Sequence, residues 1–530
     1  MSEVFVQKGN GAVQRTVELK LQESVSVLDF GAVGDTKENS DRSFSVGTDC
    51  TQAFKNALAV GNDVFVPAGG YYVKGGLEVL FGCALKGEGR AISQLFIDAS
   101  YLTSAQSIVK LNHYSEIHDI GFVFYQPDTS SRSSLINYPW AIDFSGSNRV
   151  VIDRVRVNSA WNGLNGSGNT GGSYLGFIEL GCLNNGLVLD GALDFFHGVK
   201  WHFWPFGLTQ SSGLMSIWGD GVSSALVVGA VDGFNVENIA SFQQKFVFNT
   251  NAGAVIPYLV GNMQLDGDNS RLIVQGGVVA IGKVYDTKSS NAQNESIIVQ
   301  RSGVLDIGYL RVSSDSQNYC CKTYDSALLS VHAGNIHHIN AAGGAVFVQG
   351  GTALFEDCTM DPAPSTNYNN AYCVNSGGVL KVRGNIWTAK GNGSGFATYS
   401  ANDNPLNEVR DNEFNGWSFS INGSGRLQGV YAGNKGSGSD YVGADLTGVV
   451  RRATFQVNGD ANGNASIDTG LSSIHLRVVN AFASYKGNSG EAAKCNVTAI
   501  DGSRIYLSAA QGDRPIRVTI EYTDNPFAGW

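Results

Sequence analysis

Hydrophobic and polar residues alternate in short runs along most of the chain, which is the two-residue period of a half-buried β-strand. Between residues 115 and 430 such runs recur, and helical periodicity is almost absent. The clearest runs cover residues 116–122, 151–157, 234–239, 304–310, 354–360, 382–386 and 409–414. The pattern predicts an all-β architecture for the centre of the chain.

The runs return at a nearly constant interval. Leu305, Val331, Phe355, Val382 and Val409 are separated by 26, 24, 27 and 27 residues. A repeat of that size, with strand periodicity and polar turns, is typical of a solenoid. A propeller blade needs about 40 residues, and the Leu/Asn frame of a leucine-rich repeat is missing. We therefore predict a right-handed, single-stranded parallel β-helix over residues 111–432.

A short helix is predicted in the segment 25–110, which we assign to the entry of the β-helix. Asp49 at the N-cap with Gln52 three residues later is a capping-box arrangement, and Gly61 is placed to end the helix. Residues 50–59 repeat apolar side chains at i and i+4. The helix can cover the open strand edges of the first coil.

The two ends of the chain differ from the centre. Residues 1–24 are polar and mixed in charge, which predicts an arm. Residues 433–450 are rich in Gly, Ser and Asp and are predicted to be a linker. In 451–530 the alternating strands are longer, and Asp501-Gly502 is a hairpin signal. This segment is predicted to be an antiparallel β-sandwich used for trimerisation or carbohydrate binding.

Composition narrows the class of protein. Glycine supplies 67 of the 530 residues, well above its usual share, and 43% of residues are apolar. Global disorder is excluded by this apolar content. Collagen is excluded as well, because there are 10 prolines and no glycine at every third position.

Net charge and cysteine content narrow the class of protein further. The net charge of −10 disfavours nucleic acid and anionic membranes as partners. No apolar run reaches the length of a membrane span and no leader pattern opens the chain. We therefore expect synthesis in a cytoplasm and no membrane insertion. Eight cysteines without metal or disulfide spacing are expected to be reduced and mostly buried.

Three segments near the start resemble a known family. They are VSVLDFGAVGD at 25–35, Asp49-x-Thr51-Gln52-Ala53-Phe54, and VFVPAG at 64–69. Together they resemble the entry to the pectate-lyase-like β-helix of bacteriophage tailspikes, and 15–20 resembles the arm before it. Residues 514–522 look like the C-terminal sandwiches of tailspikes, more weakly.

The resemblance implies a homotrimer that binds and cleaves a bacterial capsular polysaccharide or exopolysaccharide without a cofactor. It also implies that residues 1–24 attach to a phage tail or adaptor protein. The chain would then be made in the host cytoplasm, belong to the virion and act at the bacterial cell surface.

Hydrolysis of a glycosidic bond needs two carboxyl groups, an acid and a base or nucleophile. Coils of a β-helix stack about 4.8 Å apart, and same-face residues along a strand are about 6.6 Å apart. Two carboxyl groups on such positions can therefore have either the shorter separation of retaining glycosidases or the longer separation of inverting ones. The densest carboxylate region is 179–237, where our candidates are Asp194, Glu237, Asp190, Asp220, Asp232 and Glu179.

Asp194 and Glu237 are favoured among these carboxylates because they lie within strand patterns. Asp190, Asp220 and Asp232 each precede a glycine and could be turn residues. The fallback carboxylates are Asp153, Asp306, Glu356 and Asp357.

An aromatic segment lies inside the same region. Six of the twelve residues in 195–206 are aromatic. Exposed Trp rings stack on the apolar faces of sugars, so Trp201 and Trp204 are predicted to bind substrate, with His197, His202 and Lys200 beside them. An aromatic solenoid core is the alternative. Tailspikes of this class often carry a similar segment ending in Trp-Pro-Phe-Gly.

Three functions stay open from sequence alone. The first is an endo-glycoside hydrolase tailspike. The second is a lyase that cleaves a uronate-containing polymer by β-elimination, with Lys200 or His197 as the base. The third is a receptor-binding fibre without catalysis. Asp266-x-Asp268-Asn269 lacks the Gly and the distal Glu of a calcium loop, so no metal site is predicted.

Overall fold

The structure is a computed structural model in which the chain divides into two compact units. The first contains residues 1–316 and 326–328, and the second contains 317–325 and 329–530. The described residues are 3–21, 23, 25–39, 43–205, 212–249, 256–289, 292–314, 318–338, 344–362, 373–400, 404, 406–423, 430–432, 435–436, 450–458, 464–468, 477–485, 495–501, 504–509 and 515–523.

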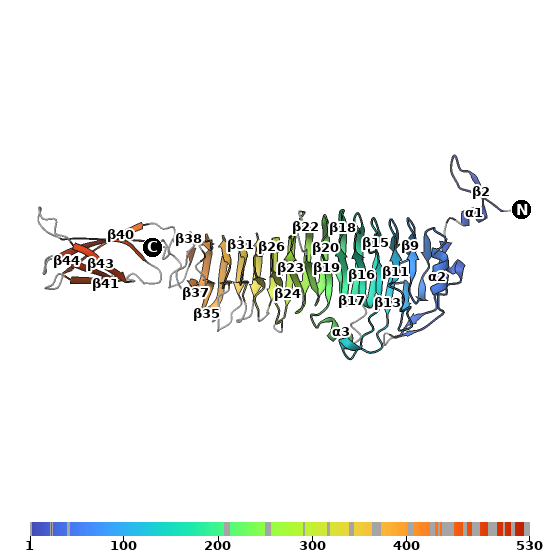
Figure 1. Cartoon of the computed structure of the whole chain (residues 1–530), viewed down its shortest axis with the longest axis horizontal. Coiled ribbons are helices and arrows are strands. Elements are labelled where there is room, and N and C mark those ends of the chain that lie inside the picture. The colour runs from blue at the N-terminus through green and yellow to red at the C-terminus, as the bar shows by residue number, and fades with distance from the viewer. Residues whose placement is uncertain are drawn as a thin grey trace. The chain divides into compact units, whose positions relative to one another are not determined.

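The first unit is a parallel β-solenoid, which confirms the predicted fold class (Figure 1). The solenoid strands pair in parallel with strands of the neighbouring coils, whereas β1 (Val4–Val6) with β2 (Gln14–Thr16) and β4 (Lys37–Glu38) with β5 (Phe44–Ser45) form separate antiparallel pairs. One stack of solenoid strands pairs in the order β17 (Tyr174–Asp190), β18 (Phe196–Phe203), β20 (Phe234–Phe242), β22 (Tyr258–Asp266), β24 (Val278–Lys288) and β26 (Val304–Ser314).

The other elements of the first unit lie before, between and beside the strands of this stack. They are β1 (Val4–Val6), β2 (Gln14–Thr16), α1 (Val17–Leu21), β3 (Val25–Ser26), a 3-10 helix (Val27–Phe30), β4 (Lys37–Glu38), β5 (Phe44–Ser45), α2 (Thr51–Leu58), β6 (Val64–Val66), β7 (Gly69–Tyr72), β8 (Leu77–Val79), β9 (Ala84–Gly87), β10 (Ser93–Ile97), β11 (Ser107–Leu111), β12 (Glu116–His118), β13 (Gly121–Phe124), a 3-10 turn (Arg132–Ser134), β14 (Trp140–Asp143), β15 (Val151–Asp153), β16 (Val155–Ser167), α3 (Ser212–Trp218), β19 (Ser224–Val228), β21 (Lys245–Asn249), β23 (Arg271–Gly276) and β25 (Ile297–Val299).

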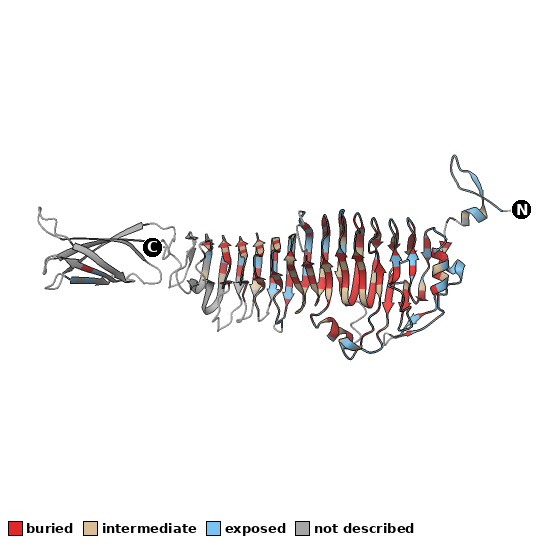
Figure 2. Cartoon of the chain, in the orientation of Figure 1, coloured by how far each residue is buried: buried red, intermediate tan, exposed pale blue. Residues whose placement is uncertain are grey.

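The solenoid core is built from the inward side chains of each strand, and Figure 2 marks the buried residues along the strands. In β20, Phe234, Val236 and Ile239 are buried while Asn238 between them is exposed. Burying one such apolar side chain contributes about 1.5–3 kcal/mol. Alternation along the strand therefore decides which face turns inward and which faces the solvent.

Several runs that the pattern predicts as single strands are two strands joined by one bent residue. Asp119 and Arg154 in the first unit, and Asp357 and Asp411 in the second, have φ between 50° and 59°. Asp tolerates this left-handed conformation better than most residues. Each bend adds one polar residue between two inward side chains, as His118 and Asp119 lie between Ile117 and Ile120, so the two-residue period is interrupted there.

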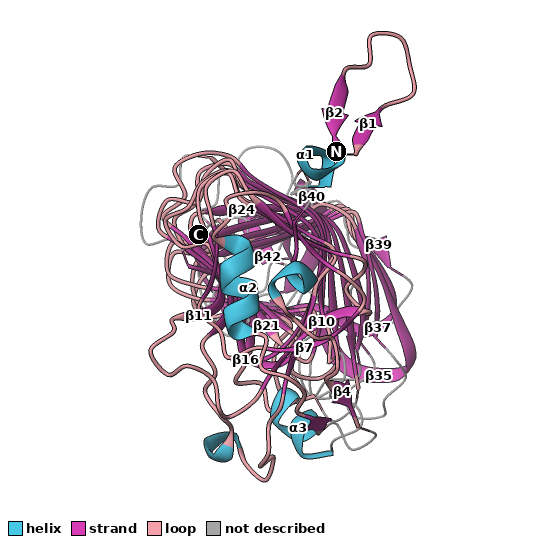
Figure 3. Ribbon diagram, turned by 90° about the vertical axis from the view of Figure 1, so that its right-hand side faces the viewer, coloured by secondary structure: helices cyan, strands magenta, loops and turns pink. Residues whose placement is uncertain are grey.

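Helix α2 lies across the first coil of the solenoid, as predicted (Figures 1 and 3). Phe54 is fully buried, and its ring centroid is 5.6 Å from that of Tyr71. The predicted capping box is wrong: Cys50 is the N-cap, without a side-chain cap bond. The Asp49 carboxylate instead accepts from the Thr51 N–H at 3.0 Å and pairs with Lys74 at 3.1 Å.

A segment carrying α3 packs against the solenoid and is fastened there by apolar and ionic contacts. Leu135, Leu183, Leu214, Ile217 and Trp218 form one buried cluster, which also contacts Trp161 and Phe242. The Arg132 guanidinium donates to Asp220 at 2.7 Å and to the Ile217 carbonyl at 2.9 Å. These contacts tie the 132–134 turn and α3 to the long strands.

The second unit begins with further parallel coils. Phe355 is in register with Val382, and Val382 with Val409, which confirms the predicted interval at these two steps. Buried asparagines follow the bends: Asn385 accepts from the Cys358 N–H at 2.8 Å, and Asn412 accepts from the Asn385 N–H at 3.0 Å. The strands are β27 (Cys321–Thr323), β28 (Leu328–Val331), β29 (Gly334–His338), β30 (Val346–Val348), β31 (Thr352–Glu356), β32 (Cys358–Pro362), β33 (Cys373–Asn375), β34 (Val379–Arg383), β35 (Ile386–Ser400), β36 (Glu408–Arg410), β37 (Glu413–Gly423), β38 (Val430–Ala432) and β39 (Lys435–Gly436).

The chain ends in two antiparallel sheets of three strands. One has the order β40 (Val450–Asn458), β45 (Pro515–Thr523), β42 (Arg477–Tyr485), and the other β41 (Asn464–Asp468), β44 (Arg504–Ala509), β43 (Cys495–Asp501). Asp501 pairs with Arg504, as the predicted hairpin requires. The predicted linker lies mostly outside the described residues. The sandwich packing, the handedness of the solenoid and the trimer stay predictions.

Seven of the cysteines are free thiols and are buried, as predicted: Cys50, Cys83, Cys182, Cys320, Cys321, Cys358 and Cys373. None of the helices in this part is long and apolar enough to cross a membrane.

Candidate functional site

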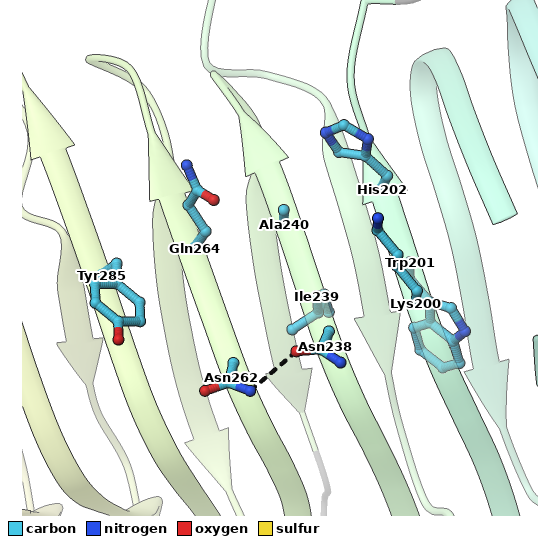
Figure 4. Close-up of a pocket in the computed structure, with 9 residues that line it drawn as sticks. All are labelled: Lys200, Trp201, His202, Asn238, Ile239, Ala240, Asn262, Gln264 and Tyr285. Carbon is cyan, nitrogen blue, oxygen red and sulfur yellow. Dashed lines mark hydrogen bonds between the residues drawn. The ribbon is translucent and has the colours of Figure 1, made fainter. Parts of the chain in front are cut away.

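An open groove of about 550 Å³ lies on the outer face of four consecutive strands, β18, β20, β22 and β24 (Figure 4). Most of the lining side chains point away from the core, while Trp201 and Ile239 are buried. The lining residues are Lys200, Trp201, His202, Asn238, Ile239, Ala240, Asn262, Gln264 and Tyr285. All nine are described, and none is a carboxylate.

Strand register arranges this face in two rows that run from coil to coil. The first row is Phe177, Lys200, Asn238, Asn262, Lys283 and Tyr309, and the second is Glu179, His202, Ala240, Gln264, Tyr285 and Arg311. Neighbours within a row are about 4.8 Å apart, and the two rows are about 6.6 Å apart. Within the first row the Asn262 amide donates to Asn238 Oδ1 at 2.9 Å, as Figure 4 shows.

Glu179 closes one end of the second row as a buried carboxylate. Its side chain is 7% exposed, and its Oε2 lies 2.7 Å from Arg90 Nε and 2.6 Å from Arg156 Nε. Burial opposes ionisation, but the hydrogen bonds from both arginines outweigh it and lower the pKa of Glu179. A carboxylate whose ionised form is stabilised by two cations is a poor proton donor, so this arrangement does not support Glu179 as a catalytic acid.

His202 follows Glu179 in the row and is half-buried. Burial lowers its pKa, and nearby Lys200 lowers it further, while Glu179 acts in the opposite direction. The imidazole is therefore neutral at pH 7 and can donate from one ring nitrogen and accept at the other. The Trp204 ring lies 5.1 Å from His202 and 4.9 Å from Phe242, so Trp204 borders the groove beside the α3 segment.

Trp201 corrects the sequence prediction. Its side chain is fully buried, its indole N–H donates to the Leu175 carbonyl at 3.1 Å, and its ring packs edge-on against Phe196 and Phe234. It is a core residue and cannot stack on a sugar. The position follows from strand parity, because Trp201 lies between the outward residues Lys200 and His202.

A second group of residues that the sequence predicted lies on strands β18 and β20 and in the turns before them, ahead of the residues that line the groove. Glu237 directly precedes Asn238, and its Oε1 is 3.8 Å from His197 Nε2. The side chains of Glu237 and His197 are 54% and 44% exposed, and His197 stacks on Tyr174 at 5.8 Å. We use the name edge cluster for Glu237 and His197, which are in contact, together with Asp194 and Asp232, which lie in the turns before β18 and β20.

Asp194 and Asp232 belong to the edge cluster because they occupy equivalent turns of neighbouring coils. Phe196 and Phe234, which follow them, are in register, and the Asp232 N–H donates to the Ala192 carbonyl at 2.9 Å. The expectation that Asp194 lies in a strand is wrong: it lies in a bend before β18, and its carboxylate accepts from the Phe195 N–H at 2.8 Å.

The other predicted carboxylates have structural partners and lie apart from the groove. Asp190 is the last residue of β17, and its carboxylate accepts from the Ala230 N–H at 2.8 Å. Asp220 pairs with Arg132 and accepts from the Val222 N–H at 2.8 Å. Of the fallback residues, Asp153 accepts from the Phe177 N–H, and Glu356 lies in the second unit, bonded to Arg383 at 2.9 Å.

Sequence reasoning missed Asn238, Asn262, Gln264 and Tyr285, which supply most of the polar groove surface. The available signal is that polar residues occupy the outward positions of successive strand patterns. It also missed Asp266, which lies two residues beyond Gln264 on the same face, and whose pKa is raised by burial.

The groove offers amide donors and acceptors, a phenol, a neutral imidazole and an ammonium group. This set can hydrogen-bond the hydroxyl groups of a sugar chain. Among the described residues, no group of three or more His, Cys, Asp or Glu is placed to hold a metal ion. Asp268, from the calcium-like sequence, accepts from the N–H and the hydroxyl of Ser289.

No protein-family model and no curated protein matches the chain. A mutant tailspike protein of E. coli bacteriophage HK620 in complex with a pentasaccharide is similar in structure, with a TM-score of 0.45, 11% identity, and coverage of 98% of this chain and 97% of that chain. The A-module of the Azotobacter vinelandii mannuronan C-5 epimerase AlgE6 has a TM-score of 0.39, 16% identity, and coverage of 78% and 99%. The catalytic unit of a GH87 alpha-1,3-glucanase from Streptomyces thermodiastaticus has a TM-score of 0.39, 14% identity, and coverage of 83% and 71%. At these values the likeness is one of general fold.

Proposed function

We propose that the chain is a phage tailspike that binds a bacterial capsular polysaccharide or exopolysaccharide in the groove and depolymerises it. The observation that carries the proposal is the groove itself, an open surface of amides and Tyr285 across four stacked strands. Adjacent rungs are about 4.8 Å apart, close to the length of one pyranose ring, so successive sugars of an extended chain can meet successive coils.

We propose endo-glycosidic hydrolysis at the edge cluster as the reaction. Glu237 adjoins the groove residue Asn238, and Asp194 and Asp232 lie on neighbouring coils. Carboxylates one coil apart suit the ~5–5.5 Å separation of a retaining glycosidase. His197, 3.8 Å from Glu237, is placed to share a proton with it.

The test is incubation of the full chain with a panel of bacterial capsular polysaccharides and exopolysaccharides. Chain length, new reducing ends and the ultraviolet absorbance of unsaturated sugars are followed together. Hydrolysis predicts reducing ends without absorbance, and a loss of about 10²-fold or more in rate for Glu237→Gln or Asp232→Asn. Asp190→Asn is the matched control, because the Asp190 carboxylate lies apart from the groove and accepts from a backbone N–H. Binding without shortening would contradict the proposed catalysis and favour a non-catalytic receptor-binding fibre.

A lyase is the second candidate, and the composition of the groove favours it. The lining lacks carboxylates but holds Lys200, His202 and Tyr285, residue types that can remove the proton next to a uronate carboxylate. This reaction predicts absorbance together with shortening. It also predicts that Lys200→Gln loses turnover while Glu237→Gln retains it.

We also propose the assembly that the family resemblance implies. The chain forms a homotrimer, and residues 1–24 dock on a phage tail or adaptor protein. Sedimentation at three times the monomer mass of 56.3 kDa would support the trimer, and a stable monomer would contradict it. If removal of residues 1–24 abolishes attachment to the phage particle while the trimer stays intact, the docking role of these residues is supported.

A further inference from the structure

The two rows of the groove face carry three exposed cations, Lys200, Lys283 and Arg311. Among the described residues, none forms an ion pair with any of the three. The Lys200 ammonium lies 5.1 Å from the centroid of the Phe177 ring, a contact that leaves its charge available to a ligand.

The carboxylates near this face do not neutralise these cations. Glu179, the one carboxylate in either row, is bonded to both Arg90 and Arg156, so that cluster of three has an excess positive charge. The carboxylates on the four strands that follow β18 in the stack lie outside the two rows; they are Glu237, Asp266, Asp286 and Asp306.

The positive charge of this face contrasts with the rest of the chain. Acidic residues outnumber basic ones by 46 to 36, and the net charge is −10. Lys200 is separated from Lys283 by three coil steps, about 14 Å in total. The coils between them carry only Asn238 and Asn262 in the first row. Cations therefore stand on both sides of the neutral amides: Lys200 lines the groove, Lys283 follows the lining residue Asn262 in the first row, and Arg311 follows Tyr285 in the second.

We propose that the groove takes an acidic polysaccharide, with anionic groups held at Lys200 and at Lys283 and Arg311, and neutral sugars held by the amides between them. This inference rests on the proposed function and adds the class of polymer to it. Carboxylated sugars and phosphate- or sulfate-substituted sugars share the required chemistry. Hydrogen bonds between a cation and such an anion are the stronger, charge-assisted kind.

The experiment measures binding of the full chain to a panel of bacterial polysaccharides. Half of the panel has acidic repeat units and half has neutral ones. The variants are Lys200→Gln and Lys283→Gln. Lys110→Gln is the matched control, because Lys110 is an exposed lysine of β11, outside the groove strands. The polymer that binds should be acidic. Each groove variant should weaken binding about threefold to tenfold, and the control should leave it unchanged.

Salt and chemical modification complete the test. Raising the ionic strength from about 0.05 to about 0.5 M should weaken binding, since screening shortens the reach of the cations. Loss of binding after the carboxyl groups of the polymer are reduced assigns the anion to a carboxylated sugar. Binding that survives reduction but still depends on Lys200 and Lys283 assigns it to phosphate or sulfate.

Two results overturn the inference and are distinguishable from each other. A bound polymer that is neutral, or groove variants that bind like the wild type, contradicts the acidic ligand while the proposed function stands. If the wild-type chain binds no polymer, the proposed function itself is contradicted, and the inference with it.

Discussion

Replacing Glu179 by glutamine removes the negative charge between Arg90 and Arg156 while keeping the size of the side chain. Breaking a buried ion pair costs about 3–5 kcal/mol. The arginine side chains here are 24% and 27% exposed. Because of this exposure, and because the amide still accepts a hydrogen bond, the cost should be smaller, about 2 kcal/mol. We expect the first unit to unfold about 4 °C lower.

The stabilisation by Glu179 should depend on pH in one direction. Its folded pKa is lowered by the two arginines. The ordinary value is about 4.3, so the contribution of Glu179 is fully present above that pH. It is lost as the pH falls through the folded pKa. The stability difference between wild type and Glu179→Gln should therefore be constant near pH 7 and shrink below about pH 4.3.

Thermal unfolding followed by tryptophan fluorescence measures this difference, and a cleavage assay on the same samples separates the two roles. Asp63→Asn is the control, because Lys86 and Asp63 form an exposed pair on the surface. Such a pair should contribute less than about 1 kcal/mol. Cleavage should persist in Glu179→Gln below its unfolding temperature. Loss of cleavage with unchanged stability would refute the structural role and restore Glu179 as a catalytic residue.

Trp201→Ala should destabilise the protein by about 3–5 kcal/mol in urea unfolding, because the ring is fully buried. Trp204→Ala should mainly weaken oligosaccharide binding, and the reverse pattern would contradict the assigned positions. Asn385→Ala should cost about 1–3 kcal/mol, since the Cys358 N–H loses its acceptor; an unchanged urea midpoint would argue against this hydrogen bond. Burial raises the pKa of Cys358 to about 12 and also raises that of Cys182. Neither thiol should therefore react with a disulfide reagent at about pH 8 until urea unfolds the chain, and rapid labelling of the native protein would show that the coils open.

The local pattern of the sequence was sufficient to predict the class of fold. Alternation predicts strands because one face of each is buried, and the repeat interval appears as the register of Phe355, Val382 and Val409. The Asp501-Gly502 hairpin was equally accessible, since its turn is encoded by adjacent residues. The bends at Asp119 and Asp357 were missed, although each leaves two polar residues between successive inward apolar residues.

The groove was decided by tertiary structure. Lys200 lies opposite Asn238, and Asn238 lies opposite Asn262, but the first of these two coils is much the longer because it carries the α3 segment. Which side chains share a row depends on the unequal lengths of the coils. It also depends on the strand register, because a slip of one residue would turn every outward side chain of a strand inward. The sequence alone therefore determined a parallel solenoid with polar outward positions. Only the stacking of the coils decided that Trp201 is core, that Glu179 is held by two arginines, and that Lys200, Lys283 and Arg311 share two rows with the groove amides.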